Sequence, residues 1–414
     1  MNDMSNSGTR ANSRVGSQGK SDNMPAAARL FFKMLNNLKT GHLQVITPDH
    51  EHVLFGDTHQ SPAATLQIND WRACGKILRG GDIGFAESIE AGWIDSPDMT
   101  ALLRLAIRNE STLDRAIFGG KLTTLWYRIK HWLRPNTRRG SSRNIHAHYD
   151  IGNDFYKLWL DPSWTYSSAI FAGDFGISLQ EAQRRKYQRI IDVLELKAGD
   201  YVLEIGCGWG GFAEHAALQG IAVRGVTISP SQLEIAKKRI SERQLEHLVS
   251  LGICDYRDMS GTFDAVVSIE MFEAVGEKFW PGYFNAVSQR LKKGGRALIQ
   301  TITIEEARFE RYRSSADFIQ QYIFPGGMLP SPERFCHQAE KQGLEVIEQY
   351  AFGQDYAETL RRWNSEFDQH REPITAQGFG EKFQRIWQLY FAYCEAGFDE
   401  GSTNVIQFTL QKNA

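Results

Sequence analysis

The feature that most constrains the fold is a glycine-rich turn between an apolar strand and a helix, VLEIGCGWGG at residues 202–211. Glycine lets the backbone turn sharply and lets a ligand approach it closely. In open α/β sheets such a turn lies beyond the carboxyl end of the first strand, where these sheets bind their ligands. The sequence therefore predicts a ligand site at Gly206, Gly208 and Gly210.

The residues around this turn distinguish between ligands. Gly206, Gly208 and Gly211 satisfy the GxGxxG pattern of dinucleotide-binding proteins, but that pattern alone is weakly specific. Glu204 lies inside the strand, as it does in S-adenosylmethionine-dependent methyltransferases. The next strand ends in GVTISPSQ, without the acidic residue that would hold an NAD ribose. These segments favour S-adenosylmethionine, and the alternative is a glycine-rich turn without a ligand.

Strands alternate with helices through the rest of the C-terminal part. This alternation predicts a mostly parallel sheet with helices on both faces, an α/β fold that we assign to residues 145–414. The CDYRD segment follows the third strand, where Asp255 can accept from an adenine amino group and Tyr256 can stack nearby. The alternative for Asp255 is a turn cap. The apolar strands are expected at residues 201–206, 222–229, 249–256, 263–272 and 296–304.

The N-terminal part has a different organisation. Residues 1–24 are rich in Ser, Asn and Gly and are predicted to be disordered. Residues 25–118 are predicted to form a small α+β domain, in which Ser96 caps a helix whose first residue is Pro97. Residues 119–144 predict a basic amphipathic helix and linker with the composition of an interfacial membrane anchor. The alternative is a helix that packs between domains.

Charge and cysteine content exclude several functional classes. The formal net charge is −2, which gives no basic excess for binding nucleic acid. The five cysteines are scattered without a CxxC pair, which argues against both a disulfide framework and a metal site. No apolar run reaches the ~18 residues of a membrane span. We therefore expect a cytoplasmic protein that meets the inner face of the membrane peripherally.

Six motifs occur in an order and spacing that resemble the cyclopropane-fatty-acyl-phospholipid synthase family: HYDIGND, DPSWTYSSAIF, VLEIGCGWGG, GVTISPSQ, SIEMFEAVG and FIQQYIFPGG. The resemblance runs from about residue 145 to the C-terminus and more weakly through the N-terminal part. It implies a Rossmann-like class I methyltransferase core, S-adenosylmethionine as donor, and unsaturated acyl chains of membrane phospholipids as acceptor. It also implies a lipid-carrier-like N-terminal domain that aids lipid capture or homodimer formation.

The resemblance also assigns residues to the donor site. The aromatic stretch at residues 148–171 resembles a lid that covers the donor and lines the acyl tunnel. The alternative for Trp159, Trp164 and Phe171 is ordinary core packing. Besides the glycine turn, Tyr166 and Ser167 match positions at the methionine end of the donor, and Thr227 and Gln232 match positions around its ribose and methionine portions.

In this family a bound bicarbonate ion is the base, and this sequence departs from its pocket at several positions. Glu273 and Ile302 are retained, whereas Ser168, Gln300 and Phe379 replace Cys, His and Tyr. Ser and Gln can still hydrogen-bond an anion, but Phe cannot. Glu273 is thus the expected catalytic polar residue. The expected product is a cyclopropane fatty acyl phospholipid, with C-methylation without ring closure as the alternative.

Two other functions compete with this prediction. A small-molecule N- or O-methyltransferase would need a preformed nucleophile, and the long aromatic lid favours an apolar acceptor. A non-catalytic lipid-binding protein on the same scaffold would have no reason to retain the glycine turn, Tyr166, Ser167 and Glu273.

Overall fold

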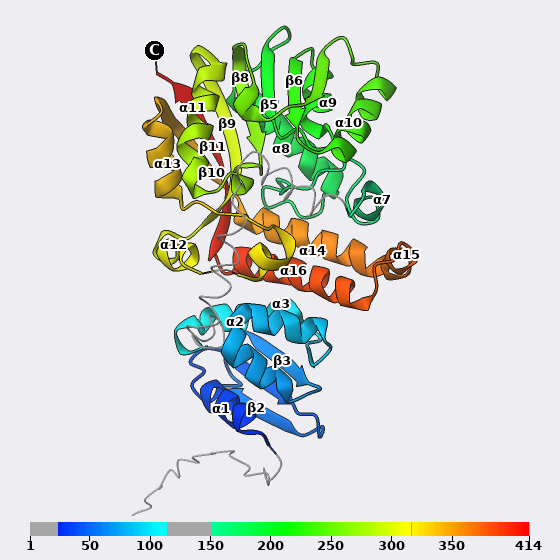
Figure 1. Ribbon diagram of the computed structural model, residues 1–414, viewed down its shortest axis with the longest axis vertical. Coiled ribbons are helices and arrows are strands. Elements are labelled where there is room, and N and C mark those ends of the chain that lie inside the picture. The colour runs from blue at the N-terminus through cyan, green and yellow to red at the C-terminus, as the bar shows by residue number, and fades with distance from the viewer. Residues whose placement is uncertain (1–23, 114–150, 316, 414) are drawn as a thin grey trace, which may run out of the picture.

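The computed structural model describes residues 24–113, 151–315 and 317–413 (Figure 1). Most of the predicted disordered tail and the predicted linker helix at 119–144 lie outside these ranges. No helix within them is long and apolar enough to cross a bilayer.

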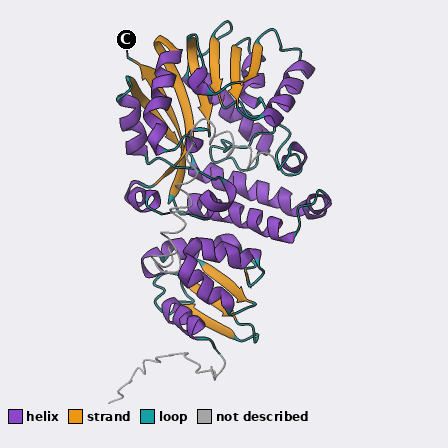
Figure 2. Cartoon of the chain, in the orientation of Figure 1, coloured by secondary structure: helices purple, strands orange, loops and turns teal. Residues whose placement is uncertain are grey.

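A seven-stranded sheet forms the C-terminal part, in the order β10-β11-β9-β8-β5-β6-β7. The central strands run parallel, and β11 pairs antiparallel with both β9 and β10. Figure 2 shows helices on both faces, which confirms the predicted Rossmann-like α/β architecture. The strands are β5 (Tyr201–Ile205), β6 (Ala222–Thr227), β7 (Val249–Ile253), β8 (Phe263–Ile269), β9 (Leu291–Ile304), β10 (Leu344–Ala351) and β11 (Thr403–Lys412).

The central strands are apolar because helices cover both of their faces. In β5 all residues after the first are buried, so the strand carries no alternation of polar and apolar side chains. The covering helices are α8 (Leu179–Val193), α9 (Gly211–Ala217), α10 (Pro230–Glu242), α11 (Trp280–Arg290) and α13 (Pro332–Glu340).

A helical layer lies between this sheet and the N-terminal unit (Figure 1). Its long helices are α14 (Gly353–Gln369) and α16 (Glu381–Asp399), and the short α15 (Arg371–Ala376) connects them. Helix α12 (Glu306–Arg313) and a single helical turn at Ile319–Ile323 lie at the same level. This layer supplies one wall of the cavity described below.

The N-terminal unit has a four-stranded sheet in the order β2-β1-β3-β4, covered by helices. The prediction for the start of its last helix was wrong by two residues: Asp98 is the N-cap, accepting the Ala101 N–H at 2.8 Å, while the Ser96 hydroxyl donates to the Thr65 backbone oxygen. The elements are α1 (Ala26–Leu35), β1 (His42–Ile46), β2 (His52–Gly56), β3 (Ala63–Ile68), α2 (Arg72–Glu90), β4 (Ile94–Asp95) and α3 (Met99–Arg108).

Candidate active site

The carboxyl ends of the parallel strands open into a cavity of about 560 Å³. This volume lies within the range of about 300–1,000 Å³ that is usual for small-molecule sites. The sheet end of the cavity gathers nearly all of the residues predicted for the donor. They are Tyr166, Ser167, Glu204, Gly206, Gly208, Thr227, Gln232, Asp255 and Tyr256.

The glycine turn leaves room for a ligand against its backbone. Gly206 and Gly208 have φ angles of 84° and 50°, a region that side-chain-bearing residues rarely adopt. A Cβ on Gly208 would meet nothing within 4 Å, whereas one on Gly210 would lie 3.2 Å from Ala236. Gly210 is not among the residues that line the cavity. The structure therefore opens ligand space at Gly208 and gives Gly210 a packing role against α10.

Polar atoms at the sheet end fit a donor that carries an ammonium group and hydroxyls. Glu204 is buried, and its Oε2 has no hydrogen-bond partner in the described residues. Asp255 combines both predicted possibilities: it accepts from the Arg257 N–H as a turn cap, and it lines the cavity. These groups are the ones that would hold S-adenosylmethionine.

A buried lysine lies beneath the donor end. Lys186 on α8 is fully buried and donates to the Ser167 hydroxyl at 2.6 Å. Burial lowers the pKa of Lys186 to about 7, and the carboxylates of Glu270, Asp161 and Glu204 act in the opposite direction. Lys186 was not among the residues predicted from the sequence, although it occupies the buried face of a helix in an i, i+4 series with apolar residues.

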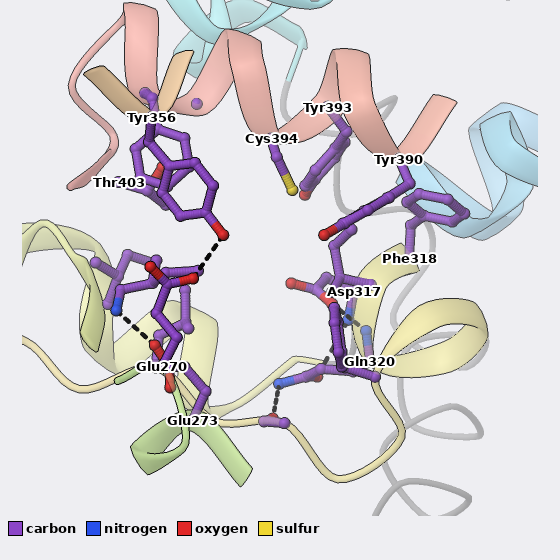
Figure 3. A pocket seen from close by; sticks show the side chains of 18 of the residues that line it. Glu270, Glu273, Asp317, Phe318, Gln320, Tyr356, Tyr390, Tyr393, Cys394 and Thr403 are labelled. Carbon is purple, nitrogen blue, oxygen red and sulfur yellow. Dashed lines mark hydrogen bonds between the residues drawn. The ribbon is translucent and has the colours of Figure 1, made fainter. Parts of the chain in front are cut away.

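Two carboxyl groups occupy the junction between the donor end and the rest of the cavity (Figure 3). Glu270 and Glu273 lie on one wall, across the cavity from Asp317, Gln320 and Tyr390. Both glutamates come from the segment after β8, at the sheet edge where α/β folds place their reactive groups. Glu270 was not among the predicted site residues, although its position directly after β8 was a signal.

Three donors converge on the Glu270 carboxylate. Its Oε1 accepts from the Ser168 backbone N–H at 2.9 Å and from the Gln300 side chain at 2.7 Å. Its Oε2 accepts from the Tyr356 hydroxyl at 2.7 Å. Glu270 also has a φ of 47°, a backbone strain of order 1–3 kcal/mol that persists only where the surroundings enforce it.

A chain of side chains fixes the orientation of the Gln300 amide. Arg189 can only donate, so Gln407 turns its oxygen toward Arg189 and its NH₂ toward the Gln300 oxygen, at 2.7 and 3.0 Å. Gln300 is left with its NH₂ facing Glu270. This series of hydrogen bonds therefore fixes the Gln300 NH₂ group as a donor to Glu270.

Glu273 is held in the protonated form. Burial and the neighbouring Glu270 raise its pKa to about 8, although the Ile302 backbone N–H donates to its Oε1 at 2.6 Å. Its Oε2 is buried without a partner in the described part of the chain. Burial also raises the pKa of Glu270, but Lys186 and its three donors oppose that rise. Of the two carboxyls, Glu270 is the one stabilised as an anion.

Glu273→Gln is expected to flatten the pH dependence of folding stability. Between pH 4.5 and about 8 the native protein keeps a proton on Glu273 that the unfolded chain releases, so this group makes stability fall as pH rises. Glutamine does not titrate and still accepts from the Ile302 N–H. Urea unfolding at both ends of this window checks the difference, with Glu277→Gln as a half-buried control. If the unfolding free energy had the same dependence on pH in wild type and Glu273→Gln, native Glu273 would not retain a proton in this window.

Of the remaining residues predicted for the anion pocket, some lie beside the two carboxyls and one does not. Ser168 contributes its backbone N–H and not its hydroxyl, and Ile302 contributes its N–H and lines the cavity. The placement of Phe379 was wrong, because it precedes α16 and packs against Phe155 and Phe383 away from the carboxyls. Tyr356 on α14 faces the carboxyls in its place, and nothing local in the sequence indicated this.

The aromatic stretch divides between the cavity and the core. Tyr166 and Trp164 line the cavity, and the Tyr166 hydroxyl lies 3.0 Å from that of Tyr390. Trp159 and Phe171 are buried in the core, which was the alternative prediction for both. Asp355 on α14 accepts from two backbone N–H groups at the end of the stretch, at 2.9 and 3.1 Å. The helical layer thus holds the stretch in place.

Beyond the carboxyls the cavity becomes apolar and continues into the N-terminal unit. It passes Tyr390 and Phe318 and then runs between the helices and the sheet of that unit. We call this part the apolar end of the cavity. Its lining includes Phe31, Leu35, Leu43, Leu66, Leu102 and Leu105.

Sequence comparisons point to enzymes that modify lipids. Residues 136–408 match the family model described as mycolic acid cyclopropane synthetase. A tuberculostearic acid methyltransferase of Mycobacterium tuberculosis is 40% identical over 353 residues, covering 81% of this chain and 80% of the relative. The cyclopropane-fatty-acyl-phospholipid synthase of Escherichia coli K12 is 33% identical over 349 residues, covering 82% and 85%.

Structural comparisons agree. A crystal structure of the mycolic acid cyclopropane synthase CmaA1, complexed with SAH and CTAB, superposes with a TM-score of 0.61 at 30% identity, covering 66% of this chain and 98% of that one. The cyclopropane synthase MmaA2 from Mycobacterium tuberculosis gives the same values. About a third of this chain lies outside the part shared with these two structures.

Proposed function

Since the chain belongs to the mycolic acid cyclopropane synthetase family of S-adenosylmethionine-dependent methyltransferases, we propose that it alkylates the cis double bond of an unsaturated acyl chain in a membrane phospholipid. The protein is an S-adenosylmethionine-dependent enzyme that acts on lipids. The proposal adds the acceptor, the bond attacked and the residues involved.

One observation carries the proposal: a single cavity joins the glycine turn to the apolar end and has two carboxyls at the junction. A methyltransferase for a small polar acceptor has no use for an apolar passage into a second unit. An acyl chain fits it, because an apolar lining spares the chain an exposure to water that would cost about 0.8 kcal/mol per CH₂. The alkene would then lie beside the carboxyls.

The chain's own residues make the reaction possible by position and by exclusion of water. When bound, S-adenosylmethionine supplies an electrophilic methyl carbon on a positively charged sulfur. An isolated alkene is a weak nucleophile, so the site must hold it in line at about 3–3.5 Å in a dry environment. Tyr166 and Trp164 present aromatic rings to the cavity, where a ring face attracts a desolvated cation by about 1–2 kcal/mol.

Two products compete after methyl transfer, because the acyl chain is left with a carbocation. Loss of a proton from the new methyl group closes a cyclopropane ring, and loss from a neighbouring carbon gives a methyl-branched alkene. The altered anion pocket and the higher identity to a relative named as a methyltransferase favour the uncyclised product. The cyclopropane fatty acyl phospholipid is the second candidate, supported by the E. coli synthase.

Expression in bacteria that contain monounsaturated phospholipids but lack a cyclopropane synthase tests the function. We expect acyl chains that have gained the mass of one methylene, and NMR of the purified fatty acids then separates a ring from a branch. Unchanged acyl chains, together with S-adenosylmethionine binding by the purified protein, would contradict the proposed acceptor.

Membrane access is part of the proposal because the double bond lies within a bilayer leaflet. The protein would reach it from the cytoplasmic surface, with the basic segment 119–144 as the proposed anchor and the N-terminal unit aiding lipid capture or homodimer formation. Vesicle flotation with and without anionic lipid measures such an association.

Leu66→Trp is expected to lower activity on long acyl chains while S-adenosylmethionine binding is unchanged. Leu66 is buried on β3 and lines the apolar end, so a larger ring shortens the space for the chain. Kinetics with phospholipids of different acyl length check this, and we expect KM to rise most for the longest chain. Leu54→Trp, on the exposed face of the same sheet, is the matched control. Equal losses for all lengths would argue against this path.

A further inference from the structure

We propose that Glu270 is the catalytic base of this enzyme, a carboxylate built into the chain at the place where a free anion would otherwise bind. The inference rests on the proposed function and deepens it, because it names the group that removes the proton. It also assigns the three donors around Glu270 a common purpose, which is to hold that carboxylate as an anion.

The first support is the position of Glu270. Its carboxyl lines the cavity at the junction between the donor end and the apolar end, across from Tyr390 and Asp317 (Figure 3). Its backbone φ of 47° is a conformation that favours glycine. A side chain kept there in spite of the strain is characteristic of functional sites.

The second support is the contrast between the two carboxyls. Glu270 accepts from Ser168, Gln300 and Tyr356, and Lys186 lies close enough to favour its charge. Glu273 accepts from the Ile302 N–H at Oε1, while its Oε2 has no partner in the described residues. Neighbouring groups with such different environments divide the roles of base and neutral partner between them.

The proton-transfer step balances on the lipid and on Glu270. After the alkene has gained the methyl group with its positive charge, a carbocation lies on the adjacent carbon. Glu270 takes a proton from the new methyl group or from a neighbouring carbon, and the C–H electron pair becomes the ring bond or the new double bond. Glu270 is left as a neutral acid and returns the proton to solvent before the next turnover.

The test compares wild type, Glu270→Gln and Glu270→Gly on unsaturated phospholipid vesicles, with and without added sodium bicarbonate. Glutamine keeps the volume but cannot take the proton, and glycine relieves the strained φ and empties the space between the three donors. We expect wild type to be independent of bicarbonate and both variants to lose at least about 100-fold in kcat. Bicarbonate should restore activity to the glycine variant only. Calorimetry should show bicarbonate binding to that variant and none to wild type, while S-adenosylmethionine binds all three.

The outcomes separate the inference from the proposed function. Dependence of wild type on bicarbonate, or full activity in both variants without it, would overturn the role of Glu270. If wild-type protein modified no lipid, the proposed acceptor would fail, and the calorimetric comparison would still test the anion site. Bicarbonate binding to wild type as tightly as to Glu270→Gly would refute that site.

Discussion

Gly208→Val should abolish S-adenosylmethionine binding, with an affinity at least about 100-fold below that of wild type. Gly208 has a φ of 50°, so a β-branched residue there is strained by of order 1–3 kcal/mol. The new Cβ also points into space that is open within 4 Å, which is where a ligand would approach the backbone. The exclusion sets the loss of affinity, because the strain is present in the free and the bound protein alike, and each 1.36 kcal/mol corresponds to a factor of ten. Isothermal titration with S-adenosylmethionine measures the loss.

Gly261→Val is the matched control for this variant. Gly261 has a φ of 83°, has open space around its Cβ position, and does not line the cavity. Its replacement therefore carries a similar backbone strain without blocking the ligand, and we expect donor affinity close to that of wild type. Equal weakening by both variants would show that strain alone accounts for the effect.

Lys186→Met should destabilise the protein by roughly 3–5 kcal/mol at neutral pH, the usual consequence of removing one partner from buried charges. Methionine keeps most of the volume but removes the positive charge that opposes the rise in the pKa of the buried Glu270 carboxyl. The loss should shrink in acid, where the carboxyls become neutral and no longer need it. Thermal unfolding at neutral and acidic pH checks both statements.

The same variant has a second, catalytic consequence. Removing the positive charge raises the pKa of Glu270 further, so the charged base forms only at higher pH. The acid limb of the pH–activity profile therefore moves to higher pH. Lys237→Met, an exposed lysine on α10, is the control. A wild-type melting temperature at neutral pH for Lys186→Met would contradict the charge balance described here.

The two carboxyls also bear on the product. In this site the proton acceptor is proposed to be a side chain with a fixed origin, so its reach is set by the backbone at Glu270 and by its bonds to Gln300 and Tyr356. A free anion could occupy several positions in the same pocket. We therefore expect one dominant product from wild type, and a mixture of ring and branch from the bicarbonate-rescued glycine variant.

Sequence patterns that are local in the chain predicted most of the fold. The glycine turn and the alternation of strands and helices each depend on residues within a few positions of one another. The predicted helix start was misplaced because Ser96 and Asp98 both offer a capping oxygen in one short segment. The choice among them depends on the bond from Ser96 to Thr65, which lies in another strand.

The sequence by itself determined the donor end of the site, because Glu204, Gly206 and Gly208 lie within five residues of one another in a single strand–turn–helix unit. Only the tertiary structure decided the reactive end. Glu270 obtains its donors from Ser168, Gln300 and Tyr356, which lie far apart along the chain, and the buried Lys186 comes from yet another helix. No local pattern encodes such a convergence, because the free energy that keeps a charge buried comes from groups that meet only when the sheet and the helical layer have packed together.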